Sequence, residues 1–224
     1  PGDIQILMDS GPSSNISSKL SQYLPFYDRE IELAILTHPH ADHLSGFLQV
    51  LKDYHIKNFI LAGANYESKI YSDFVKLLKE EGSNVYVAKS GDSVAWNNAP
   101  ILKILWPNKI ALGQNFKSIH DSTVISQLNL GQKKFLLMGD AEEDLESALI
   151  ASKVITDIDI LKIGHHGSKT STSENLLQTA QPEEAIIQVG RNSYGHPTQI
   201  VLDRLAKFGV KVFRNDQAGD IIYR

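Results

Sequence analysis

Short apolar runs separated by polar turn residues divide the chain into many predicted β-strands. Runs rich in Val, Ile, Leu and Phe and bounded by Gly, Pro, Asn or Asp are typical of strands that are buried on at least one face. They occur at Ile4–Met8, Leu33–Leu36, Phe59–Leu61, Val85–Val87, Ile101–Leu105, Val124–Leu130, Phe135–Met138, Ile158–Ile163, Ala185–Val189 and Val210–Phe213.

Apolar residues spaced three and four positions apart predict amphipathic helices between these strands. The clearest helices are expected at Leu44–Tyr54, Ile70–Leu78, Glu142–Ile150 and Ile200–Phe208, with a short one from Ser173 to near Pro182. The stretch 89–118 mixes Gly, Asn and Pro with short strands and predicts hairpins and loops. Strands and helices alternate without a linker, which favours an α/β fold.

The composition is that of a compact protein. With 224 residues, 42% of them hydrophobic and 21% charged, the chain can bury a substantial core, and we expect a single domain spanning 1–224. It contains no apolar run near the ~20 residues that a membrane helix needs. The absence of cysteine excludes disulfides and thiolate metal ligands.

The net charge of −4 provides no global basic field for nucleic acid, so any such site must be local. Basic residues close to the polar motifs could supply it, although the same residues could be ordinary surface charges. They are Lys133, Lys134, Lys162, Lys169 and Arg191.

Three histidines and an aspartate follow the apolar run 31–37 within six residues. Neutral imidazole is a common zinc ligand, and carboxylate oxygen suits zinc, manganese or iron. Alternate side chains of an extended segment point the same way, so His38 and His40 can converge on one metal ion. Asp42 and His43 follow where the chain bends and can reach a second ion. The pattern therefore predicts a metal centre.

The H-x-H-x-D-H string at 38–43 resembles the signature of the metallo-β-lactamase superfamily. Further motifs follow the order of that superfamily, at Ile6–Gly11, Phe135–Asp140, Leu161–Ser168 and Asn192–Pro197. The series is most similar to the C-terminal hydrolase domain of the ComEC family, the DNA-uptake channel proteins of naturally competent bacteria. The resemblance covers about Ile4 to Arg224 and implies a four-layer αββα sandwich, with two mixed sheets between helices.

The resemblance also implies a set of metal ligands, which are His38, His40, Asp42, His43, Asp140, His165 and His196. Asp140 would bridge two ions, although an aspartate before 141–143 could instead cap a helix. Asp9 would hold a ligand histidine in the right tautomer, and the alternative is a plain turn former.

Two positions leave alternatives open. Adjacent residues of an extended chain point in opposite directions, so only one of His165 and His166 is expected to touch metal or substrate. His120 stands where ComEC-like sequences usually have asparagine. It is either a ligand of the first metal or a group that contacts the scissile phosphate, and if it is neither, His165 or His166 supplies the third ligand of that metal.

The implied chemistry is hydrolysis by two divalent ions, zinc or manganese, with iron also suitable. Bound ions lower the pKa of water to near neutral and polarise a phosphoryl or carbonyl oxygen. Asp42, His120 and His166 are the expected catalytic residues, and the leaving oxygen would be protonated by His120 or by whichever of His165 and His166 is not a ligand. Ser168 and Lys169 would donate to phosphate oxygens, unless their loop only caps the next helix.

The favoured function is therefore a phosphodiesterase or nuclease acting on DNA, preferably single-stranded, during DNA uptake in competence. A hydrolase of a small phosphodiester, ester or lactam, and a non-catalytic scaffold domain, are the alternatives. Because Pro1–Asp3 leads straight into the first strand, we expect that the domain lacks its first strand or strands. A ComEC-like parent would carry a membrane channel domain in the same chain and attach this soluble domain to the bacterial cell membrane; otherwise it would be cytoplasmic.

Overall fold

The computed structural model describes residues 4–97 and 99–223, which form two compact units. The first unit comprises Pro1–Lys89 and Lys109–Val124, and the second comprises Ser90–Asn108 and Ile125–Arg224. Each unit has its own sheet and its own hydrophobic core. The expectation of a single domain stays a prediction. Among the described residues, no helix is both long and apolar enough to cross a membrane.

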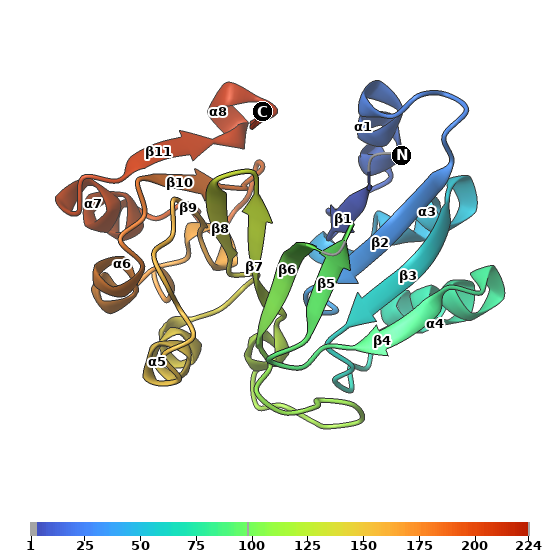
Figure 1. Cartoon of the computed structure of the whole chain (residues 1–224), viewed down its shortest axis with the longest axis horizontal. Helices are drawn as coiled ribbons and strands as arrows, with labels where there is room; N and C mark the ends of the chain where they lie inside the picture. The colour runs from blue at the N-terminus through green and yellow to red at the C-terminus, as the bar shows by residue number, and fades with distance from the viewer. Residues whose placement is uncertain (1–3, 98, 224) are drawn as a thin grey trace. The chain divides into compact units, whose positions relative to one another are not determined.

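The first unit is built on a four-stranded parallel sheet in the order β1-β2-β3-β4 (Figure 1). Its strands are β1 (Ile6–Met8), β2 (Glu30–Leu36), β3 (His55–Leu61) and β4 (Asn84–Val87). Each connection between neighbouring strands contains helix, as parallel pairing requires. These helices are α1 (Asn15–Tyr23), α2 (Ala41–Leu44), α3 (Phe47–Asp53) and α4 (Lys69–Glu81), and a short helix η1 (Ile119–Ser122) also belongs to this unit.

Three phenylalanines tie the helices of the first unit to its sheet. Phe47 of α3, Phe59 of β3 and Phe74 of α4 are fully buried, and their ring centroids lie 5.0 to 6.0 Å apart. Aromatic pairs at such distances contribute about 0.5–1.5 kcal/mol each beyond the area that they bury. The predicted helix at 70–78 is therefore confirmed, whereas the single helix predicted at 44–54 is divided between α2, which ends at Leu44, and α3, which begins at Phe47.

The second unit contains a seven-stranded sheet in the order β11-β10-β9-β8-β7-β6-β5. Its strands are β5 (Ser93–Trp96), β6 (Ala99–Trp106), β7 (Ile125–Leu130), β8 (Lys133–Leu137), β9 (Ile160–Lys162), β10 (Glu184–Ile187) and β11 (Lys211–Arg214). Strands β5 to β8 pair antiparallel, and β8 to β11 pair parallel. The helices are α5 (Glu143–Ala151), η2 (His165–Gly167), α6 (Glu174–Ala180), α7 (Gln199–Lys207) and α8 (Asn215–Ala218).

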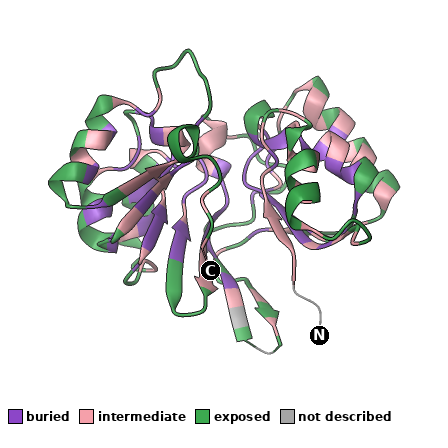
Figure 2. Ribbon diagram, turned by 90° about the horizontal axis from the view of Figure 1, so that it is seen from above, coloured by how far each residue is buried: buried purple, intermediate pink, exposed green. Residues whose placement is uncertain are grey.

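The predicted class, an α/β fold with two sheets and helices, is confirmed. One detail differs: the first sheet is parallel along its described strands, not mixed, because every connection between them contains a helix. Figure 2 shows purple, buried positions along the strands and green, exposed positions on the helices within each unit. Helix α1 was not predicted, and none of its residues is fully buried.

Candidate metal centre

The histidines of the first unit gather where β2 ends and α2 begins. His38 is 1% exposed and His43 3% exposed, and their ring centroids lie 4.3 Å apart. His40, the residue before α2, is half-buried, and its ring centroid lies 4.7 Å from that of His38. The structure thus brings together the imidazoles that the spacing predicted would converge. Asp42 is exposed on α2, with Oδ2 3.8 Å from Nε2 of His43.

His120 joins this cluster from η1, far along the chain. Its Nε2 lies 3.2 Å from Nδ1 of His40, and its ring centroid is 5.5 Å from that of His38. Two nitrogens on one tetrahedral zinc, each about 2.1 Å from the ion, lie roughly 3.4 Å apart. The separation therefore fits two ligands of one metal ion, and the histidines are suitable for zinc, manganese or iron.

Asp9 orients the cluster from the end of β1. Its carboxylate accepts hydrogen bonds from the Thr37 backbone N–H and hydroxyl, both at 2.8 Å, and lies 2.7 Å from His43 Nδ1. A proton held on Nδ1 makes Nε2 of His43 the nitrogen suited to a metal. The observed contact is the one that the resemblance implied for Asp9.

A tight backbone contact holds the helical turn in this position. Ser10 Oγ donates to the His43 carbonyl and accepts from Phe47 N–H, at 2.9 and 2.8 Å. A Cβ atom at Gly46 would lie 2.2 Å from the Ser10 carbonyl oxygen, closer than real Cβ contacts. Only glycine fits here, so Gly46 allows the turn to pack directly on the segment after β1.

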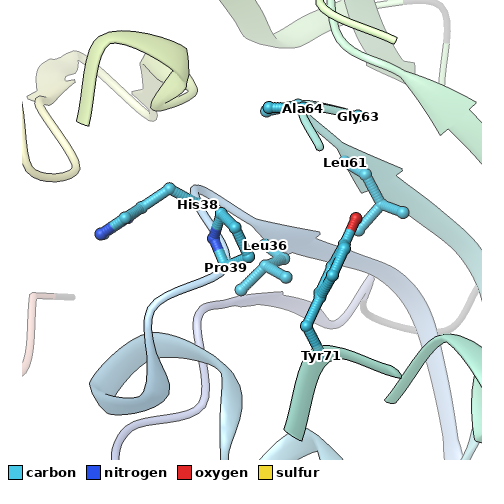
Figure 3. A pocket seen from close by; sticks show the side chains of 8 residues that line it. Leu36, His38, Pro39, Leu61, Gly63, Ala64 and Tyr71 are labelled. Atoms are coloured by element: carbon cyan, nitrogen blue, oxygen red, sulfur yellow. The ribbon is translucent and has the colours of Figure 1, made fainter. Parts of the chain in front are cut away.

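A small pocket adjoins His38 within the first unit (Figure 3). Leu36, Leu61 and Tyr71 form much of its wall, and the imidazole of His38 points away from Tyr71. Burial raises the pKa of the Tyr71 hydroxyl, which keeps it protonated at neutral pH. Tyr66 packs edge-on against His40, with centroids 5.7 Å apart. Aromatic side chains therefore border the histidine cluster.

In the second unit, Asp140 lies after β8 with its side chain almost fully buried. Gly139 before it has φ +53, a left-handed conformation in which glycine is unstrained. Oδ2 of Asp140 lies 3.9 Å from His165 Nε2, and Oδ1 lies 3.7 Å from His166 Nε2. The alternative role as a helix cap is not what the structure shows, because the residue that precedes α5 is Glu142.

Both His165 and His166 approach Asp140, so the expectation that they point in opposite directions is wrong. The segment is not extended there: the two residues have φ +44 and +52 within η2. Left-handed φ values in non-glycine residues are strained and persist only where the surroundings enforce them. Here each Nδ1 has an acceptor, the Glu142 carboxylate at 3.2 Å from His165 and the Gln188 carbonyl at 2.7 Å from His166.

Glu142 is a residue of the site that sequence reasoning missed. Its Oε1 lies beside His165 Nδ1 and also accepts the Thr170 hydroxyl at 2.7 Å. A carboxylate in this position favours a proton on Nδ1 and so directs Nε2 of His165 toward Asp140. In sequence Glu142 is an acidic residue at a helix start, which is common for dipole reasons alone and carries no signal of a site.

His196 lies beside His165, with ring centroids 5.6 Å apart. Partial burial, more than the neighbouring His165 and His166, lowers its pKa, and Asp140 opposes that shift. The neutral, metal-binding form of His196 is thus favoured down to lower pH than usual. Asp140, His165, His166 and His196 therefore gather in the second unit, and metal ligation by Asp140, His165 and His196 stays a prediction.

Comparisons with known proteins show what the whole chain is similar to. No protein-family model matches the chain. ComE operon protein 3 of Bacillus subtilis is 30% identical over 197 residues, which cover 88% of this chain and 25% of that protein. Recombination protein 2 of Haemophilus influenzae is 30% identical over 221 residues, covering 96% of this chain and 26% of that protein. The chain therefore spans about a quarter of the length of these relatives.

A 108-residue match to competence protein ComA of Neisseria gonorrhoeae is 33% identical. Among solved structures, the metallo-β-lactamase fold protein YhfI of Bacillus subtilis superposes with a TM-score of 0.60 at 15% identity, covering 96% of this chain and 85% of that one. The chain is a metallo-β-lactamase-fold relative of these three proteins. The fold class expected from the motifs is thereby confirmed.

In this metallo-β-lactamase fold, buried anchors hold the loop that follows His165 and His166. Glu146 of α5 is fully buried, and its carboxylate accepts Thr172 N–H at 2.6 Å and Ser173 N–H at 2.8 Å. Arg204 of α7 donates to the Ser171 carbonyl at 3.0 Å. Thr172, although β-branched, has φ +57. The loop is therefore held in a strained conformation by contacts from two helices.

The two residues predicted to bind phosphate lie in this loop in different environments. Ser168 is buried, and its hydroxyl is 2.9 Å from that of Thr170. Lys169 is exposed. The ammonium group is thus accessible to a substrate, whereas the Ser168 hydroxyl belongs to the hydrogen-bonded group of Thr170 and Glu142 that supports His165. Substrate binding by both residues stays a prediction.

Proposed function

We propose that this chain is a metal-dependent hydrolase that binds two divalent ions, zinc or manganese, with iron as a third possibility. The observation that carries the proposal is the 3.2 Å approach of His40 Nδ1 and His120 Nε2 beside the buried His38. This separation is close to the roughly 3.4 Å between two imidazole nitrogens that bind one tetrahedral ion. Membership of the metallo-β-lactamase fold supports a second ion and a bridging role for Asp140, which we propose by resemblance to the family.

The ions, when bound, supply a hydroxide at neutral pH and stabilise charge on the substrate oxygen. The chain's own residues orient the histidine side chains and move protons. Asp9 fixes His43, and Glu142 fixes His165, each through Nδ1. His166, whose Nδ1 is hydrogen-bonded to Gln188, or His120 donates a proton to the leaving oxygen. The exposed carboxylate of Asp42 is accessible to the attacking water; it serves as a metal ligand and accepts a proton from that water.

We further propose that the substrate is DNA, preferably single-stranded. Support comes from the names of the relatives, which are competence and recombination proteins. Because the chain matches only a quarter of the first two, we propose that the parent protein continues into a membrane channel domain and holds this domain at the cell membrane. Exposed Lys169 and Arg191 can contact phosphate in an otherwise acidic chain.

The test is a substrate panel with metal-free protein to which zinc, manganese or iron is added singly. Labelled single- and double-stranded DNA, bis-p-nitrophenyl phosphate and nitrocefin represent the candidate substrate classes. We expect cleavage of single-stranded DNA and negligible lactam hydrolysis. Turnover of the small phosphodiester or nitrocefin without DNA cleavage would assign a small-molecule hydrolase, and metal binding without any turnover would assign a scaffold domain.

A further inference from the structure

The loop between β10 and α7 presents a large aromatic side chain next to the proposed metal ligands of the second unit. Tyr194 is 80% exposed, among the most exposed of the large hydrophobic residues in the described chain. Its ring stacks on that of His196, with centroids 5.8 Å apart and planes 30° apart. One side of the ring therefore rests on a proposed metal ligand, and most of the ring surface remains open to solvent.

Asn192 fixes this loop from within. Its Oδ1 accepts the backbone N–H groups of Tyr194 and His196, at 3.1 and 3.0 Å. Its Nδ2 donates to the carbonyls of Gly190 and His196, both at 2.9 Å. Gly195, at φ +74, provides the left-handed residue that the turn between them requires.

Such a loop presents the Tyr194 ring in a set position, which lowers the ordering cost of binding a ligand against it. Isolated exposed aromatics are ordinary on protein surfaces. Tyr194 differs because its backbone is held by Asn192 and its ring by His196. A planar group of a substrate can therefore stack on this ring, which is held in place beside a proposed metal ligand.

The chemistry of the same loop indicates which planar group. Arg191 lies on the same loop, three residues before Tyr194, and is exposed. It is a local positive charge on a chain whose net charge is −4. An aromatic face and a cation on the same loop are a combination that binds single-stranded nucleic acid, because bases stack on the ring and the cation pairs with phosphate. We propose that Tyr194 is a stacking platform for one nucleobase adjoining the scissile phosphodiester, with Arg191 contacting a neighbouring phosphate.

This inference rests on the proposed action on single-stranded DNA, and binding can be measured apart from cleavage. The experiment is fluorescence anisotropy of a labelled single-stranded oligonucleotide with the full chain, free of metal and at low salt. Tyr194→Ala should weaken binding by about 5- to 150-fold, the range that corresponds to the ~1–3 kcal/mol of one base on an aromatic ring. Tyr194→Phe keeps the ring and should stay within about twofold of wild type. Tyr27→Ala removes another strongly exposed tyrosine, 75% exposed, and should change nothing.

Two further arms separate stacking from charge. An oligonucleotide of abasic sites retains its phosphates but has no base to stack, so wild type and Tyr194→Ala should bind it equally. Arg191→Ala should reduce the dependence of affinity on salt, whereas Tyr194→Ala should leave that slope unchanged. Circular dichroism of each variant verifies the fold.

The outcomes distinguish the inference from the function on which it rests. If wild type binds the oligonucleotide and Tyr194→Ala binds equally well, the platform is wrong while DNA remains the substrate. Loss of affinity in Tyr194→Phe as great as in Tyr194→Ala would also overturn it, because the hydroxyl and not the ring would then carry the contact. If wild type binds no DNA at all, the proposed substrate fails and the platform with it.

Discussion

Replacing the buried carboxylate of Glu146 should loosen the loop that carries His165 and His166. In Glu146→Ala the N–H groups of Thr172 and Ser173 lose their acceptor. A buried donor left without a partner costs about 1–3 kcal/mol, so the two together cost roughly 2–6 kcal/mol. Removing a carboxylate whose charged form is disfavoured by burial offsets part of this cost. We expect a net loss of about 2–4 kcal/mol in the free energy of unfolding.

The pH dependence of the free energy of unfolding provides a second test of Glu146. Burial raises the pKa of Glu146 above 4.5, and the hydrogen bonds from Ser173 and Thr172 oppose that shift only in part. Because the pKa of Glu146 is raised in the folded state, its contribution to stability is fully present below about pH 4.5. That contribution is lost as pH rises through the pKa of Glu146 in the folded state. Glu146→Gln cannot titrate and retains one acceptor oxygen. Its destabilisation relative to wild type should therefore be greater at low pH than at neutral pH.

Urea denaturation of the metal-free chain measures the free energy, and hydrogen exchange reports the loop directly. Amide exchange over 165–173 should accelerate in Glu146→Ala and Glu146→Gln. Asp144→Ala, an exposed acidic residue on the same helix, is the matched control and should match wild type. Unchanged exchange in this loop, or stability within about 0.5 kcal/mol of wild type in Glu146→Ala, would refute the anchoring role.

The remaining predictions concern the metal centre. Asp42→Ala and His196→Ala should each abolish hydrolysis while their circular dichroism stays native, whereas the control Asp73→Ala on α4 should retain hydrolysis. Wild-type turnover with full metal content in Asp42→Ala or His196→Ala would reject the assignment of that residue as a metal ligand. The chain should bind two divalent ions, and Asp140→Asn should lose most of the metal measured by plasma emission; a full complement in that variant would exclude a bridging carboxylate. In the metal-free protein, His196 should titrate by NMR below 6.5, because burial and the nearby histidines lower its pKa. Its contribution to stability should be present above pH 6.5 and fall as pH drops through the folded-state pKa; a midpoint above 6.5 would contradict the local electrostatics.

Local sequence patterns predicted much of the fold because they reflect local physics. The apolar runs correspond to observed strands, and the spacing at 44–54 placed Phe47 in the core as expected. Helix α1 gave no such signal, since Asn15–Tyr23 is rich in Ser and buries no residue completely. The approach of His38 to His40 was predictable because alternate residues of an extended segment point the same way.

Other features of the site depend on contacts that no local pattern contains. His120 reaches His40 across 80 positions of the chain. His165 and His166 adopt positive φ values, which non-glycine residues avoid unless surrounding contacts hold them. Glu142 and Glu146 look in sequence like the solvated acidic start of a helix. Only the folded chain shows that one supports His165 and the other anchors the following loop.

The measurement that tests the account most directly is metal-dependent cleavage of a single-stranded oligonucleotide by wild type and Asp140→Asn, with metal content determined on the same samples. We predict that wild type loaded with manganese or zinc cleaves the DNA, that chelation stops cleavage, and that Asp140→Asn loses both metal and activity. Wild type that is fully loaded with metal yet cleaves no phosphodiester, or Asp140→Asn that cleaves as fast as wild type, would contradict the account.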